Sequence, residues 1–376
     1  PNNTVRFGSA GIHLSESHPQ GDPPIVANPL QTRVTELLGC DYPILQTGMG
    51  WVATPKLVAA ACNAGAFGFL AAATIPPSEV EAAILEIKEL TDRPFGVNFL
   101  MDAPGADVIS QAIIRQGVRA AGYNRAPSAE LIQSLKDGGV VCVPTCGAVK
   151  HTTKAQKLGA DIIIVQGGEG GGHTGTTPST LLSSASADLV DVPIVAAGGF
   201  RDGRGLIAAL AFGAEGVAMG TRFLMTAESP LPPASFERYE KAGLSDVVVS
   251  TALDGMPQRM VANELLANLE KAGPVRKLIL ALRSARALQA ETGASIPDLL
   301  KSGFAMRRSQ GLSISQTIMA ANAPILARIG VADGDPVNGY LASGTVAGVI
   351  NDRPTCDELV RSIVEEAEQT LKRLAP

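Results

Sequence analysis

Short runs of apolar, β-forming residues recur along the first 220 or so positions, mostly about 22 to 31 residues apart. The runs are Pro43–Gln46, Phe67–Leu70, Phe95–Asn98, Val118–Ala121, Val140–Val143, Ile162–Val165, Pro193–Ala196 and Gly216–Met219. Segments of helical character such as Pro77–Leu90 and Ser128–Lys136 lie between them. Alternating strands and helices indicate a parallel sheet, and eight such units favour a closed α/β barrel of the TIM (β/α)8 type over an open sheet.

The same pattern predicts where the barrel begins and ends. Before Leu30 the chain is polar and rich in Pro and Gly, and at Pro230, Pro232 and Pro233 the alternation stops. We therefore expect an N-terminal arm at residues 1–29, the barrel at 30–230, a mainly helical capping domain at 231–330 and a segment returning to the barrel at 331–376.

The expected helices of the later part are Ala262–Lys271, Val275–Leu288, Ile296–Ser302 and the amphipathic segment Thr355–Leu371. Thr355 and Glu358 have the spacing of a capping box, in which each side chain binds the other residue's backbone N–H. This spacing predicts that the last helix begins just after Thr355.

Composition and charge narrow the class of protein. Apolar residues make up 45% of the 376 and charged residues 18%, which suits a large packed core. The net charge of −5 and the absence of a dense Lys/Arg stripe argue against nucleic acid as a partner. No apolar run reaches the roughly 18 residues of a membrane span, and no secretory signal pattern opens the chain. We expect a cytoplasmic protein that acts on a small molecule, and a homodimer stays open because nothing identifies an interface.

The five cysteines are an odd number spread along the chain, typical of reduced core residues. Cys142, Cys146 and His151 lie close together, but zinc ligands usually come as two tight pairs that supply four ligands. We therefore predict no metal site.

A glycine-rich loop with one histidine follows the sixth predicted strand. Gln166–Gly175 contains six glycines and His173. Glycine allows the backbone to approach a planar ring or a phosphate, and frees N–H groups for an anion. An imidazole in such a loop is placed to act as a general base or to stabilise a developing anion. His173 is therefore the predicted catalytic residue.

The other strand ends carry candidate ligand contacts. Glycine-bearing turns after the last two strands, at Gly199 and Gly220–Thr221, are typical of the phosphate site of a barrel. Gly48 and Met49 follow the first strand, and Asn98 ends the third. A phosphate at one side and a ring reaching across the barrel mouth match flavin mononucleotide (FMN), although another phosphorylated ligand would fit the phosphate turns equally well.

At these residues the chain resembles the nitronate monooxygenase family, formerly called 2-nitropropane dioxygenases, which also includes FMN-dependent enoyl reductases and NADH:quinone reductases. The resemblance runs from about residue 30 to the C-terminus and is carried by the segments QTGMGWVATP, NAGAFGFLA, PFGVNF, GADIIIVQGGEGGGHTG and AAGGFRDGRGLIAALAFGAEGVAMGTRFL. It implies an FMN-binding TIM barrel with a smaller, mainly helical domain over the site.

The resemblance also implies roles for residues. His173 falls on the family's catalytic histidine, and the implied FMN contacts are Gly48, Met49, Asn98, Gln166, Gly171, Gly172, Gly199, Gly220 and Thr221. Thr145 stands where many nitronate monooxygenases have Lys, which weakens transfer of that activity. The late segments MAANAP and ASGTVAG are similar to a subgroup that acts on CoA thioesters in steroid-ring breakdown.

Three functions follow as hypotheses. The first is oxidation of an alkyl nitronate with O2 at the flavin. The second is hydride transfer between the flavin and an enone or acyl-CoA, with NAD(P)H as a further redox partner. In that case Arg204, Arg222 and Arg259 are candidate contacts for the phosphates of the nucleotide or of CoA, or they are ordinary surface arginines. The third is a flavin-binding barrel without catalysis, against which His173 argues.

Overall fold

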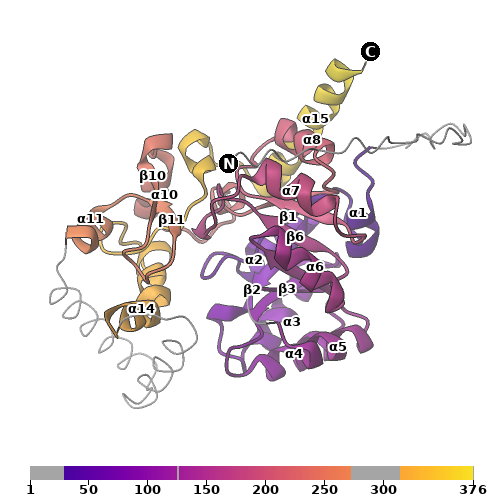
Figure 1. Ribbon diagram of the computed structural model, residues 1–376, viewed down its shortest axis with the longest axis horizontal. Helices are drawn as coiled ribbons and strands as arrows, with labels where there is room; N and C mark the ends of the chain where they lie inside the picture. Colours follow the sequence, from indigo (N-terminus) through magenta and orange to yellow (C-terminus); the bar gives the residue numbers. More distant parts are fainter. Residues whose placement is uncertain (1–28, 125–126, 272–313, 376) are drawn as a thin grey trace, which may run out of the picture.

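The computed structural model describes residues 29–124, 127–271 and 314–375. Eight parallel strands close into a barrel in the order β1-β2-β3-β4-β5-β6-β8-β9 (Figure 1). Their bounds are β1 Ile44–Gln46, β2 Phe67–Ala71, β3 Gly96–Leu100, β4 Ala120–Asn124, β5 Val141–Cys146, β6 Ile163–Gln166, β8 Ile194–Ala197 and β9 Val217–Met219. Each predicted strand overlaps one of these, so the prediction of a TIM barrel is confirmed.

Helices surround the barrel and connect its strands. Their bounds are α1 Arg33–Leu38, α2 Pro55–Asn63, α3 Val80–Leu90, α4 Ala106–Arg115, α5 Ala129–Asp137, α6 Val149–Lys157, α7 Ser179–Ala187, α8 Gly203–Ala211 and the short α9 Thr221–Leu224, with a 3-10 turn η1 at Ala72–Thr74. Apolar side chains fill the space between strands and helices, and Leu45, Phe67, Val143 and Val195 belong to a smaller cluster of strand residues. Because the strands are buried on nearly all positions, they read as continuous apolar runs in the sequence.

The last helix, α15 (Cys356–Leu374), returns to the barrel and packs on α8. Its predicted capping box is present. The Thr355 hydroxyl accepts a hydrogen bond from the Glu358 N–H at 3.2 Å, and the Thr355 N–H donates to Glu358 Oε2 at 2.8 Å.

A small antiparallel sheet lies beside the barrel (Figure 1). Strands β10 (Val247–Ser250) and β11 (Gln258–Val261) pair with each other, and β11 also pairs with β7, the two residues Gly172–His173 of the glycine-rich loop. In this pairing Gln258 lies opposite His173. The sequence analysis predicted a mainly helical segment at residues 231–330 and did not predict β10 or β11.

The other elements beyond the barrel are α10 (Pro233–Glu240), η2 (Leu244–Asp246), α11 (Glu264–Lys271), α14 (Ile314–Val331) and η3 (Thr345–Val349). The expected helix Ala262–Lys271 corresponds to α11. The arm at residues 1–28 and the expected helices Val275–Leu288 and Ile296–Ser302 lie outside the described residues, and the division into separate domains stays a prediction. Within the described ranges no helix has both the length and the apolar character to cross a bilayer.

Candidate active site at the mouth of the barrel

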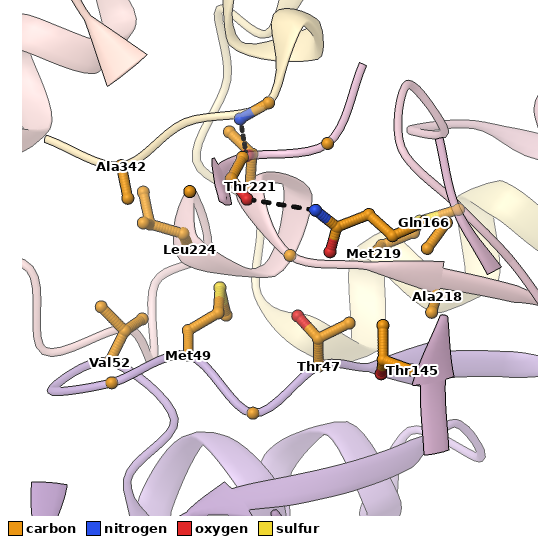
Figure 2. A pocket seen from close by; sticks show the side chains of 18 of the residues that line it. Thr47, Met49, Val52, Thr145, Gln166, Ala218, Met219, Thr221, Leu224 and Ala342 are labelled. Carbon is orange, nitrogen blue, oxygen red and sulfur yellow. Dashed lines mark hydrogen bonds between the residues drawn. The ribbon is translucent and has the colours of Figure 1, made fainter. Parts of the chain in front are cut away.

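A cavity of about 420 Å³ opens at the carboxyl ends of the barrel strands. The barrel forms one wall, and residues of α14 and of the segment after it, from Pro324 to Val346, form the other. All of the predicted site residues line this one cavity: Gly48, Met49, Asn98, Gln166, Gly171, Gly172, His173, Gly199, Gly220 and Thr221. Figure 2 shows Thr47 and Met49 facing Thr221 and Leu224 across it, with the Gln166 side chain extending between them.

Asn98 is held against the loop after β1. A Cβ atom at Gly48 would lie 2.5 Å from Asn98 Cβ, so only glycine lets the loop pass this close. On the other side the Asn98 amide nitrogen would lie 2.8 Å from a Cβ at Gly122 in β4. The amide is therefore fixed between the loop after β1 and strand β4, where it lines the cavity.

The turn after β8 has a left-handed backbone. Gly198 has φ +100° and Gly199 has φ +83°, conformations that strain any residue with a Cβ. A Cβ at Gly198 would also lie 2.9 Å from Ser179 Oγ and 3.0 Å from the Gly170 nitrogen. This turn therefore needs glycine both for its backbone angles and for its contact with the glycine-rich loop.

Thr221 begins α9 next to this turn and is buried. Its hydroxyl oxygen accepts a hydrogen bond from the Gly344 N–H at 2.9 Å, which joins the barrel to the opposite wall. The hydroxyl proton stays available to an acceptor, and the first N–H groups of a helix have no partners within it. This corner offers hydrogen-bond donors, and the Glu169 side chain, whose carboxylate accepts hydrogen bonds from the Ser179 N–H and hydroxyl, packs against Gly199.

The glycine-rich loop is tied down at several points. Gln166 Nε2 donates to the His173 carbonyl at 3.0 Å, so this side chain shapes the loop as well as lining the cavity. Arg259 Nη2 donates to the Gly168 carbonyl at 2.8 Å, and the Thr345 N–H donates to the Glu169 carbonyl at 2.9 Å. Residues far along the chain therefore fix the position of His173.

His173 forms a hydrogen-bonded pair with a carboxylate that the sequence did not reveal. Its Nε2 lies 2.7 Å from Oδ2 of Asp254 in the turn between β10 and β11. The Asp254 side chain is 3% exposed, whereas that of His173 is 49% exposed and reaches the cavity. The Met256 N–H and Gln258 Nε2 also donate to the Asp254 carboxylate.

Burial raises the pKa of Asp254, but the hydrogen bonds from His173, Met256 and Gln258 outweigh this effect and leave the pKa below its ordinary value. Asp254 is therefore a carboxylate near neutral pH and holds the proton of the neutral imidazole on Nε2. Nδ1 then carries the lone pair. This arrangement suits a general base whose orientation and protonated form are both stabilised by a buried carboxylate.

No Asp, Glu, Lys or Arg side chain lines the cavity among the residues that the structure describes. The three candidate arginines are used elsewhere. Arg222 binds Asp352 at 2.6 Å, Arg204 binds Asp202 at 2.6 Å, and Arg259 holds the Gly168 carbonyl. Any anion in this cavity would thus be held by backbone N–H groups, hydroxyls and the N–H donors of residues such as Asn98, Trp51 and protonated His173.

Three further lining residues carry buried polar atoms that have no partner in the described part of the chain: Trp51 Nε1, Asn124 Oδ1 and the Tyr340 hydroxyl. Trp51 has φ +65°, the one positive value outside glycine in the described ranges. Leaving a buried polar atom unpaired costs about 1–3 kcal/mol. Such atoms around a cavity indicate groups that pair with a bound molecule.

Cys142 and Cys146, considered above as metal ligands, are buried, and burial raises their thiol pKa to about 12 and about 11. His151 is exposed on α6. In the described ranges no group of His, Cys, Asp or Glu side chains is arranged to hold a metal ion.

Comparison with known proteins identifies the family. A family model described as nitronate monooxygenase matches residues 31–124 and 112–366. A (3aS,4S,5R,7aS)-5-hydroxy-7a-methyl-1-oxo-octahydro-1H-indene-4-carboxyl-CoA dehydrogenase from Rhodococcus jostii is 50% identical over 92% of this chain and 98% of its own length. A probable nitronate monooxygenase from Staphylococcus saprophyticus is 31% identical over 64% of this chain and 81% of its own.

The solved structure of FabK from Thermotoga maritima superposes with a TM-score of 0.73 at 31% identity, covering 92% of this chain and 98% of that one. The family match spans most of the chain, including the glycine-rich loop with His173 and the segment that carries Asp254. This chain is an oxidoreductase that belongs to the nitronate monooxygenase family.

Proposed function

We propose that this chain is an FMN-dependent dehydrogenase that oxidises the hydroxyl group of a hydroxyacyl-CoA thioester to a ketone. The observation that carries the proposal is the 50% identity, over nearly the full length of both chains, to a dehydrogenase whose named substrate is such a thioester. In that substrate the hydroxyl and the carboxyl-CoA group stand on adjacent ring carbons, so the hydroxyl is β to the thioester carbonyl.

The residues that line the cavity suit FMN. Glycines are frequent in its barrel wall and leave backbone accessible to a ring, and Thr221 with the turns at Gly199 and Gly220 supplies hydrogen-bond donors for a phosphate. Unpaired Asn124 Oδ1 and Trp51 Nε1 offer an acceptor and a donor to a bound molecule. We assign the phosphate to Gly199, Gly220 and Thr221.

The other predicted contacts would hold the rest of the cofactor: Gly48, Met49, Asn98, Gln166, Gly171 and Gly172. When bound, FMN supplies the hydride acceptor. The chain itself must position the substrate and handle its proton.

Loss of a hydride from a carbon bearing a hydroxyl group leaves a ketone only if the hydroxyl proton also departs. His173 Nδ1 accepts that proton, and the resulting imidazolium is stabilised by the Asp254 carboxylate at 2.7 Å from Nε2. Pro324, Ala327 and Val331 of α14 contribute apolar side chains to the opposite wall of the cavity.

Oxidation of an alkyl nitronate, the first function expected from the sequence, ranks second. The catalytic histidine is expected for both functions, so the ranking depends on the comparisons. The relative named for that activity shares 31% identity over 64% of this chain, against 50% over 92% for the dehydrogenase. Thr145, at the position where many relatives are expected to carry Lys, lines the cavity.

The test is anaerobic mixing of the FMN-loaded protein with a β-hydroxyacyl-CoA, a nitronate, NADH and NADPH in separate syringes, following flavin absorbance. We expect the hydroxyacyl-CoA to bleach the flavin and the nitronate to be inert. Flavin bleaching by the nitronate alone would support nitronate oxidation instead of the proposed dehydrogenase activity. A protein that takes up no FMN would contradict the cofactor assignment.

A further inference from the structure

Tyr340 stands in the wall opposite the barrel with its hydroxyl next to the glycine-rich loop. The side chain is 5% exposed and lines the same cavity as His173. Its hydroxyl would lie 4.0 Å from a Cβ at Gly172, the residue before His173, and it has no hydrogen-bond partner in the described chain. The hydroxyl is also close enough to Asp254 to feel its charge.

The surrounding structure holds this side chain firmly. The Tyr340 N–H donates to the Leu326 carbonyl of α14 at 2.6 Å, and Asn263 Nδ2 donates to the Gly339 carbonyl at 2.8 Å. The ring packs in an apolar cluster with Leu253 and Met260, on either side of the Asp254 turn. Tyr340 is therefore positioned by the same segment that positions the partner of His173.

Two other buried tyrosines show what is particular about Tyr340. The Tyr239 hydroxyl donates to the Ala342 carbonyl at 2.8 Å, so its polar group is satisfied within the protein. The Tyr123 hydroxyl is also unpaired, but Tyr123 packs in the apolar cluster around α3 and α4 and does not line the cavity. Tyr340 alone of the three combines an unpaired hydroxyl with a place in the cavity wall.

We propose that the Tyr340 hydroxyl donates a hydrogen bond to the reacting oxygen of the substrate, the same oxygen whose proton passes to His173. The proposal rests on the proposed function, because it takes the substrate to be an alcohol that becomes a ketone. As the hydroxyl proton moves to His173 Nδ1, negative charge develops on this oxygen, and a fixed donor stabilises that charge.

The electrostatics of the site agree with this role. Burial and the negative charge of Asp254 both raise the pKa of Tyr340 above its ordinary value. Tyr340 therefore keeps its proton near neutral pH and serves as a donor without competing for the substrate proton.

The experiment compares Tyr340→Phe with Tyr123→Phe, two changes that each remove one buried, unpaired hydroxyl and leave an isosteric ring. Both are measured with FMN bound, by anaerobic flavin reduction over a range of concentrations of a β-hydroxyacyl-CoA. For Tyr340→Phe we expect the limiting reduction rate to fall about a hundredfold, with the apparent Kd of the acyl-CoA changed less than about fivefold. Tyr123→Phe should reduce at the wild-type rate.

A second measurement separates this role from a structural one. Neither variant loses a hydrogen bond within the protein, so both should keep the FMN absorbance spectrum and the midpoint of thermal unfolding. A reduction rate for Tyr340→Phe within threefold of wild type would overturn the proposal, and so would a rate loss matched by Tyr123→Phe. If the wild-type flavin itself is not reduced by any hydroxyacyl-CoA, it is the proposed function that fails, which the wild-type control reveals.

Discussion

The two walls of the cavity are built in different ways. The barrel wall consists of strand ends and glycine-bearing turns, and it contributes backbone N–H groups and hydroxyls. The opposite wall, from Pro324 to Val346, contributes the unpaired Tyr340 hydroxyl and apolar side chains of α14, and the turn between β10 and β11 on the same side carries the buried Asp254 carboxylate that contacts His173. The difference suggests a division of work in which the barrel holds the cofactor and the other wall controls the proton of the substrate.

If this division is right, removing the base should abolish turnover without releasing the cofactor. For His173→Ala we expect flavin reduction by a hydroxyacyl-CoA to fall by about 10²- to 10⁴-fold, because no other group takes the hydroxyl proton. FMN content, read from the absorbance spectrum, should match wild type. His151→Ala, which removes an exposed histidine on α6, is the matched control and should be fully active. If His173→Ala kept full activity, His173 would not be the general base.

Substitution of Asp254 tests whether its carboxylate contributes to turnover through His173. Asp254→Asn keeps the shape of the side chain but loses the charge that stabilises the imidazolium, so we expect the reduction rate to fall by about 10- to 100-fold. The change should appear in the limiting rate rather than in the apparent Kd of the acyl-CoA. Asp188→Asn, at an exposed helix end, serves as the control. If both variants behave alike, the His173–Asp254 pair is structural only.

The barrel wall is probed by Gly198→Ala. The left-handed backbone at φ +100° and the contacts at 2.9 Å and 3.0 Å leave no room for a methyl group, and strain of this kind costs about 1–3 kcal/mol. We expect weaker FMN binding, measured by fluorescence titration of the apoprotein, and a reduction rate close to wild type once the protein is saturated. Gly147→Ala, in a position with open space around it, is the control. Unchanged FMN affinity would show that the turn after β8 does not hold the cofactor.

The barrel wall of the cavity could be predicted from the sequence, whereas most of the opposite wall could not. The strands are predictable because both of their faces are buried, which gives continuous apolar runs. The density of glycine around His173 indicates a loop that contacts a ligand. Val247–Val249 is a β-branched run that could have indicated β10, but the four residues of β11 show no alternation. Asp254 lies in an Asp-Gly turn, which has an ordinary structural explanation. Its contact with His173, across 81 positions, exists only in the folded chain.

Acid should lower the stability of the folded protein through the Asp254 carboxylate. The folded-state pKa of Asp254 is lowered, so its contribution to stability is present above the unfolded-state pKa of about 3.9 and is lost as the pH falls through the folded-state value. We therefore expect the difference in free energy of unfolding between wild type and Asp254→Asn to shrink as the pH falls below about 4. Urea unfolding at a series of acidic pH values measures it. A difference that does not shrink below that pH would contradict a lowered pKa of Asp254.

The smallest effect concerns Thr221, where the two walls meet. Thr221→Val removes a hydroxyl that accepts from the Gly344 N–H at 2.9 Å and that we assign to the phosphate of FMN. We expect losses of about 1 kcal/mol each in unfolding free energy and in FMN binding, the second seen as a roughly fivefold higher Kd. Thr221→Ser keeps the hydroxyl and should restore both. If Thr221→Val loses stability but binds FMN as tightly as wild type, the hydroxyl only joins the walls, and the phosphate is held by the backbone of the barrel alone.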